Sequence, residues 1–171
     1  GIVDRVLRAV KLDPALYREV GADQSKTIEA MVVTGVAALI SGLGGVIFAG
    51  QGIGSWLLGA ILAATLGLAI GTGIIFLVGK LFKGQGQYIE LFRGLGYAYA
   101  PTALGIIPFV GGIVGSIWSI VCAIRAVREI NRVPDGAAIA TVLIPVAVVV
   151  VLALIVAALL GLALMGMMQG G

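Results

Sequence analysis

Three long stretches of this chain contain no charged residue, and they limit what it can fold into. The uncharged stretches cover residues 30–79, 94–124 and 136–171. The 11 lysines and arginines fall instead in three short windows, residues 5–26, 80–93 and 125–132. A helix that crosses a bilayer needs about 20 predominantly apolar residues, and each uncharged stretch exceeds that length. The pattern predicts an all-α, multi-pass bundle of transmembrane helices.

Composition supports a membrane location and argues against a nucleic-acid partner. Of the 171 residues, 60% are hydrophobic and 11% are charged, whereas soluble domains carry about 25% charged residues. The net charge of +3 comes from basic residues confined to the ends of apolar spans. Such residues mark the cytoplasmic face of a membrane protein. We therefore expect the lipid bilayer, and no nucleic acid, as a partner.

The stretch between Arg93 and Arg125 decides the topology. Its 31 residues are too many for one span and few for two, since two passes would leave about 15 residues each, or about 22 Å of helix. A single crossing would place the basic residues of window 125–132 opposite the other eight, which the positive-inside bias disfavours. A return to the same side keeps all of them together. We therefore predict a hairpin with both ends cytoplasmic.

The same stretch contains a point where the chain can reverse. Pro108, with Gly111 and Gly112 just after it, breaks a helix and permits a tight turn. The expected hairpin has two short helices, about residues 89–107 and 109–127. Helices of this length fall short of the roughly 30 Å apolar core, so we expect local thinning or shielding by neighbours.

The remaining apolar runs complete a five-span arrangement. We expect the other spans at about residues 27–49, 55–78 and 137–165. With the hairpin they place the N-terminus in the cytoplasm and the C-terminus outside. Residues 1–26 form a cytoplasmic amphipathic segment, and residues 27–171 form the membrane domain.

Residues 1–11 predict a short amphipathic helix with a basic face. Its apolar residues fall in one arc, while Arg5, Arg8 and Lys11 fall in the opposite arc. Such a helix can lie in the lipid headgroup region, with these three residues at the membrane surface. It can equally pack on the cytoplasmic face of the protein itself. Asp13 and Pro14 then predict an N-cap and the first position of another helix.

Few residues suggest chemistry. The chain has no histidine, which removes the commonest general base and metal ligand. No ionisable group lies deep in a span, as proton relays and ion-coupled carriers usually require. The single cysteine, Cys122, is expected to be a small buried hydrophobe. We predict no catalytic residue, no cofactor and no metal, and therefore no enzyme.

Small residues spaced four apart predict close helix packing. Gly67 with Gly71, and Gly111 with Gly115, would let helix backbones approach each other in lipid. The contact can lie within one subunit or form a dimer seam. The nearby Tyr97 either belongs to an aromatic belt at the interface or points its hydroxyl into the bundle.

Three segments resemble the Yip1-domain family of membrane proteins, in its prokaryotic branch. They are RVLRAVKLDPALYREVGADQSKT before the first span, GLGYAYAP at residues 94–101 and WSIVCAIRAVREI at residues 118–130. The second contains the Gly-Tyr-x-x-x-Pro pattern as Gly96, Tyr97 and Pro101. The resemblance implies a five-helix bundle with a cytoplasmic N-terminus. Eukaryotic relatives act in vesicle trafficking and bind Rab-type small GTPases and each other.

Two functional hypotheses remain open at this point. The first is a non-enzymatic scaffold, assembly factor or accessory subunit that acts through helix contacts with a membrane-protein partner or a second copy of itself. The alternative is a transporter or channel for a small neutral or lipidic solute that uses the hairpin. A weaker third idea is that residues 1–11 sense or shape the cytoplasmic leaflet.

Overall fold

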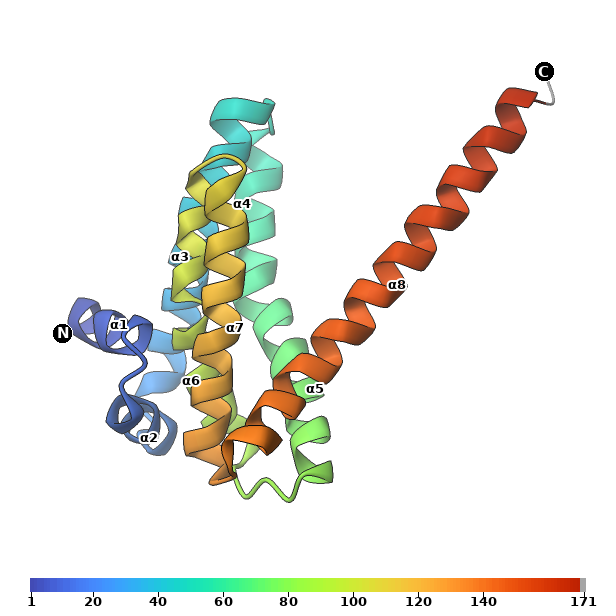
Figure 1. Ribbon diagram of the computed structural model, residues 1–171. Coiled ribbons are helices and arrows are strands. Elements are labelled where there is room, and N and C mark those ends of the chain that lie inside the picture. Colours follow the sequence, from blue (N-terminus) through green and yellow to red (C-terminus); the bar gives the residue numbers. More distant parts are fainter. Residues whose placement is uncertain (170–171) are drawn as a thin grey trace.

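Helices are the only regular elements in residues 1–169, the part of the chain that the computed structural model describes. In order they are α1 (Ile2–Val10), α2 (Pro14–Ala22), α3 (Lys26–Ala49), α4 (Ile53–Leu62), the π-helical segment η1 (Ala63–Gly67), α5 (Leu68–Leu81), α6 (Tyr88–Ala98), the 3₁₀ helix η2 (Ala100–Ile106), α7 (Val110–Asn131) and α8 (Asp135–Gln169). Figure 1 shows them as a bundle with one diverging helix. The predicted all-α transmembrane bundle is confirmed.

Within the part of the chain that the structure describes, four helical segments are long and apolar enough to cross a membrane. They are Lys26–Ala49, Ile53–Leu81, Val110–Asn131 and Asp135–Met168. The fifth segment is the composite of α6 and η2, which forms a hairpin with α7. Gly94 in α6 lies against Ile130 near the end of α7, so the two arms run in opposite directions. The chain therefore returns to the side from which it entered.

The two arms of the hairpin cover residues 88–106 and 110–131, close to the expected 89–107 and 109–127. Helix α7 has 22 residues, which is about 33 Å at 1.5 Å per residue. Helix α6 has 11 residues and η2 has 7. Because a 3₁₀ helix rises about 2 Å per residue, the composite arm also reaches about 30 Å. Both lengths include charged residues at the basic end, and the uncharged part of α7, residues 110–124, has 15 residues or about 22 Å. The expected shortfall against the apolar core therefore stays a prediction.

The switch from α-helix to 3₁₀ helix begins at a proline. Pro101 has no N–H to continue the α-helical ladder and disfavours the α conformation of the residue before it. The Thr102 hydroxyl donates to the Tyr99 carbonyl at 2.6 Å. The segment η2 then packs between α3 and α7, two helices that shield its backbone from lipid.

Glycines on α7 make this close packing possible. A Cβ atom at Gly111 would lie 1.9 Å from the Leu104 carbonyl oxygen, and one at Gly115 would lie 2.6 Å from that of Pro101. No side chain fits at either distance without movement of the backbone. The turn itself lies at residues 107–109, where Phe109 has a φ of 65°. Gly111 and Gly112 already belong to the first turn of α7.

The three basic windows lie at one end of the bundle. Arg18 of α2 pairs with Glu129 near the end of α7. The loop between α5 and α6 reaches the same corner, because the Gln85 amide donates to the Asn131 carbonyl at 3.0 Å. We call this region, formed by α1, α2, the α5–α6 loop and the α7–α8 corner, the basic end. In Figure 1 the α5–α6 loop and the α7–α8 corner lie at the bottom of the bundle, with α2 at the lower left and α1 above it.

Helix α8 differs from the other spans because most of it leaves the bundle. Its first turns pack against α5 and α7, and it then runs diagonally away and ends level with the α3–α4 turn (Figure 1). Only 6% of its most apolar window is buried, against 22–39% for the other three long spans. Its 35 residues measure about 52 Å, which explains a strongly tilted course.

Candidate functional site

A carboxylate joins three elements at the basic end. The Arg5 guanidinium in α1 donates to both oxygens of Glu29, at 2.6 and 2.8 Å. The fully buried Tyr97 in α6 donates its hydroxyl to the same carboxylate. Hydrogen bonds to Glu29, and secondly to Tyr97, raise the pKa of Arg5 above its usual range. A bidentate, charge-assisted contact of this kind fixes orientation as well as position.

Arg93 joins α6 to the ends of two other helices. It is buried, and its guanidinium donates to the Gly21 carbonyl at 2.5 Å and to the Thr27 hydroxyl at 2.9 Å. Gly21 lies in the last turn of α2, where orphan carbonyls make a cation favourable. In the sequence this arginine looked like an ordinary positive-inside charge, whereas in the fold it is an internal contact.

Helix α1 packs on the protein's own basic end and still exposes part of its apolar face. Tyr17 donates its hydroxyl to the Ala9 carbonyl at 3.0 Å, and Trp118 donates its ring N–H to the Val10 carbonyl at 2.9 Å. Burial raises the pKa of Tyr17. Val3 and Leu7 remain exposed. The helix therefore has apolar side chains free for lipid while its C-terminal end is held by the bundle.

The basic face of α1 is largely neutralised within the protein. Arg5 pairs with Glu29, and Arg8 pairs with Asp13 at 2.7 Å and with Glu19 at 3.1 Å. The contact with Arg8 lowers the pKa of Asp13. Asp13 also caps α2 by accepting from the Ala15 amide, as the sequence indicates. Of the three residues predicted at the membrane surface, Arg5 and Arg8 thus form ion pairs with carboxylates of the protein itself.

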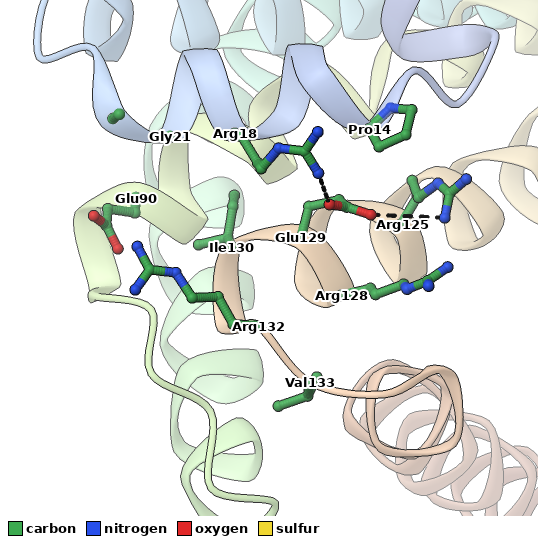
Figure 2. Close-up of a pocket in the computed structure, with 11 residues that line it drawn as sticks. Pro14, Arg18, Gly21, Glu90, Arg125, Arg128, Glu129, Ile130, Arg132 and Val133 are labelled. Carbon is green, nitrogen blue, oxygen red and sulfur yellow. Dashed lines mark hydrogen bonds and ion pairs between the residues drawn. The ribbon is translucent and has the colours of Figure 1, made fainter.

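An open groove of about 830 Å³ lies between α2 and the ends of α6 and α7. Its charged lining residues are Arg18, Glu90, Arg125, Arg128, Glu129 and Arg132. Figure 2 shows Arg18 and Arg125 approaching Glu129 from opposite sides, with Arg132 on the side of Glu90. The excess of arginine leaves the groove basic, so it can accept an anionic group such as a phosphate or carboxylate. Within residues 1–169, no group of three His, Cys, Asp or Glu is placed to hold a metal ion.

The residues of the Gly-Tyr-x-x-x-Pro pattern lie where three helices meet. A Cβ atom at Gly96 would lie 2.6 Å from that of Ala30, so α6 and α3 cross at backbone distance. The Thr34 hydroxyl donates to the Gly96 carbonyl at 3.2 Å across the same crossing. Tyr97 points into the bundle at Glu29, and Pro101 is the second residue of η2. The pattern thus occupies the junction of α3, α6 and η2.

The two predicted glycine pairs lie in different surroundings. Gly111 and Gly115 face η2 within the chain. Gly67 is exposed, and a Cβ there would meet only the Leu62 carbonyl of its own helical turn, at 3.5 Å. A Cβ at Gly71 would make an ordinary contact, 3.4 Å from the Tyr99 hydroxyl. Whether the first pair forms a seam with another chain remains a prediction.

Helix α8 carries a further stripe of small residues, Ala153, Ala157 and Gly161, spaced four apart. A Cβ atom at Gly161 would meet nothing within 4 Å. The stripe therefore has no contact that would explain it within the described chain. Such spacing is typical of helices that pack closely in lipid.

Sequence reasoning missed the long-range polar contacts of the basic end. Nothing in the sequence singled out Glu29 as a long-range contact, and Arg93 was interpreted only as a basic residue that flanks an uncharged stretch. Asn131, 2% exposed, was also missed, although Gly79, Gly84 and Gly86 surround it. The density of glycine in the α5–α6 loop is the one sequence signal that could have indicated a close approach there.

Comparison with known proteins gives one match. A family model described as the Yip1 domain matches residues 14–158. No curated protein and no solved structure matches the chain. The matched region begins at α2 and ends within α8, so it contains four of the five membrane segments in full and residues 135–158 of the fifth.

Proposed function

Because this chain belongs to the Yip1-domain family, we propose that it is a non-enzymatic membrane protein that holds another membrane protein through helix contacts. Its role would be that of a scaffold, assembly factor or accessory subunit, in keeping with the association of the family with membrane trafficking. The observation that carries the proposal is that most of α8 lies outside the bundle and packs against no other helix within residues 1–169. The partner is a transmembrane helix, contributed by a second copy of the chain or by another protein.

Two properties of α8 support such a contact. From Val148 to Met168 its large side chains are exposed on all sides, so the chain itself provides almost no packing partner for this part of the helix. In lipid, van der Waals packing between close backbones drives helix association, and small residues spaced four apart permit it. The stripe of Ala153, Ala157 and Gly161 supplies that surface on a helix that has left its own bundle.

The placement of charge supports an orientation for the assembly. All three basic windows lie at one end, and the positive-inside bias assigns that end to the cytoplasm. Residues 1–26 would then form a cytoplasmic segment that packs on the membrane domain of residues 27–171. The N-terminus would be cytoplasmic and the C-terminus outside. The basic groove of Figure 2 would face the cytoplasm, where it could receive an acidic segment of the partner.

The alternative, transport of a small neutral or lipidic solute, has one supporting observation. A cavity of about 360 Å³ opens among α5, η2, α7 and α8. A cavity indicates binding and not passage, because a transporter must also open to the other side. Scaffolding therefore remains the favoured function.

The test is the mass of the protein purified from native membranes in a mild detergent or lipid nanodisc. We expect a mass above the 17.4 kDa of one chain, either as a multiple of it or with a defined co-purifying membrane protein. A single chain without a partner under all such conditions would contradict the proposal.

A matched pair of substitutions locates the contact. Gly161→Leu and Gly166→Leu add the same side chain to the same helix, and both sites are open in a single chain. The two positions lie about 140° apart around the helix. We expect only Gly161→Leu to reduce the assembled fraction. Equal effects of the two changes would place the contact elsewhere.

A further inference from the structure

A cavity lies inside the membrane domain, where α8 begins to leave the bundle. It has a volume of about 360 Å³ and is lined by α5, η2, α7 and α8, which puts it in the lower range of small-molecule sites. Ser119, which lines it, is 6 residues before Arg125, the first charged residue of α7, or about 9 Å along the helix. The cavity thus lies within the uncharged part of the bundle, on the side of the basic end.

One wall of the cavity presents an unpartnered polar atom. Ser119 is 4% exposed, and its hydroxyl has no hydrogen-bond partner within residues 1–169. A second buried hydroxyl without a described partner, that of Thr72, lies on α5 directly beside the lining residue Gly71. The neighbouring Tyr99 also lines the cavity, and its hydroxyl faces Gly71. Buried hydroxyls in hydrocarbon are costly unless they are hydrogen-bonded, so this cluster requires a partner.

The opposite wall is apolar and opens toward lipid. It is formed by Val142, Pro145, Val146, Val149 and Val150 of α8, the turns over which α8 separates from α5 and α7 (Figure 1). Among the described residues that line the cavity, none is Asp, Glu, Lys or Arg. A charged ligand would therefore lose its hydration without compensation.

We propose that this cavity binds an uncharged amphiphile, a hydrocarbon chain or ring that carries one hydroxyl or carbonyl group. The ligand enters sideways from the bilayer between α8 and the bundle. Its apolar part lies along the valines of α8. Its polar atom hydrogen-bonds to the Ser119 hydroxyl, which can donate to a carbonyl or accept from a hydroxyl. This site goes beyond the proposed scaffold, since it requires no protein partner.

The test uses the purified full chain in lipid vesicles and two light-activated probes. The first is a long-chain alcohol with a mid-chain diazirine, and the second is the same chain without the hydroxyl. After illumination, labelled peptides are mapped by mass spectrometry. We expect the alcohol to label the cavity-lining parts of α7 and α8 about fivefold more than the hydrocarbon, the usual effect of one hydrogen bond.

Two variants with matched controls decide the outcome. Ser119→Ala should reduce alcohol labelling to the level of the hydrocarbon, whereas Ser55→Ala, whose hydroxyl already donates to the Gly52 carbonyl, should not. Val149→Trp should occlude the cavity and reduce labelling by both probes, whereas Val148→Trp, which lies outside the lining, should not. Equal labelling by the two probes, labelling confined to other helices, or no effect of Val149→Trp would overturn the proposal. A preparation that is a lone monomer but still binds the alcohol would contradict the scaffold and support this site.

Discussion

Glu29 accepts hydrogen bonds from two other elements, so its replacement should loosen α1 and α6 together. In Glu29→Gln the neutral amide cannot offer Arg5 two charged oxygens, and the guanidinium, with 20% of its side chain exposed, loses its counter-charge. We expect the free energy of unfolding to fall by about 1–3 kcal/mol, the usual cost of losing a charge-assisted hydrogen bond. Thermal unfolding in detergent measures this loss.

The control for this change is Glu19→Gln. Glu19 also pairs with an arginine, Arg8, but 49% of its side chain is exposed, and exposed pairs contribute about 0–1 kcal/mol. A loss at Glu19 as large as that at Glu29 would show that general surface charge, and not the buried junction, sets the stability.

Asp13 makes the attachment of α1 sensitive to acid. The hydrogen bond from Arg8 lowers the pKa of Asp13 in the fold, so the ionised form stabilises the native contact. That stabilisation is complete above the unfolded pKa of about 3.9 and is lost as the pH falls through the lower folded value. Trp118, which donates to Val10 of α1, should report the release of α1 by fluorescence in a Trp56→Phe background.

An uncharged variant distinguishes the contribution of Asp13 to the acid transition from the contributions of the other carboxylates. Asp13→Asn keeps an N-cap residue but abolishes the ion pair with Arg8, so the part of the acid transition that depends on this pair should disappear. Asp23→Asn is the control, because the pKa of Asp23 is also lowered, chiefly by Ser25, away from α1. If Asp23→Asn had the larger effect on Trp118, the assignment to Asp13 would be wrong.

At the level of elements, the contact between α7 and η2 offers a sharp test. Gly111→Ala would place a methyl group 1.9 Å from the Leu104 carbonyl oxygen, whereas Gly112→Ala on the same turn would meet nothing within 4 Å. Overpacking of this kind costs about 1–3 kcal/mol or more, while Gly112→Ala should be neutral or slightly stabilising. Thermal unfolding of the two variants side by side measures the difference.

The elements that the sequence predicted well are those encoded by local properties. The expected span at 27–49 is observed at Lys26–Ala49, and the span at 55–78 lies within Ile53–Leu81, because apolar length and flanking charge are readable residue by residue. The hairpin followed from charge placement. The 3₁₀ form of η2 could not be predicted from the sequence, because it depends on the packing of α3 and α7 on either side. The hydrogen bonds of Glu29 to Arg5 and Tyr97 could not be predicted either. They join residues that are 24 and 68 positions apart, and no periodic pattern in the sequence indicates such contacts.

For the whole molecule, the length of α8 predicts a response to bilayer thickness. A helix of about 52 Å fits an apolar core of about 30 Å only if it tilts strongly, and a thicker bilayer requires less tilt. Spin labels at Phe48→Cys and Met165→Cys, both exposed, in a Cys122→Ser background would measure the distance between the far ends of α3 and α8. We expect this distance to shorten as the lipid chains lengthen.

The control keeps both labels within the bundle. Labels at Phe48→Cys and Ile113→Cys, on α3 and α7, should show no dependence on lipid length, since these helices pack on either side of η2. If the distance to Met165 is equally constant, then α8 is held at its angle by packing and not by the thickness of the apolar core.

The 3₁₀ segment also has a consequence for how the protein is made. Its backbone is shielded by α3 on one side and by the glycines of α7 on the other, and lipid cannot supply the missing hydrogen bonds. The first arm of the hairpin should therefore be a poor membrane anchor when it emerges alone during synthesis. We expect the arm to remain at the translocon until α7 has been translated, and then to enter the bilayer together with α7. The arm has no cysteine of its own, so the reporter is Leu104→Cys in a Cys122→Ser background. Nascent chains that stop at Phe109 should leave this thiol accessible to aqueous thiol reagents, whereas chains that extend beyond Asn131 should protect it.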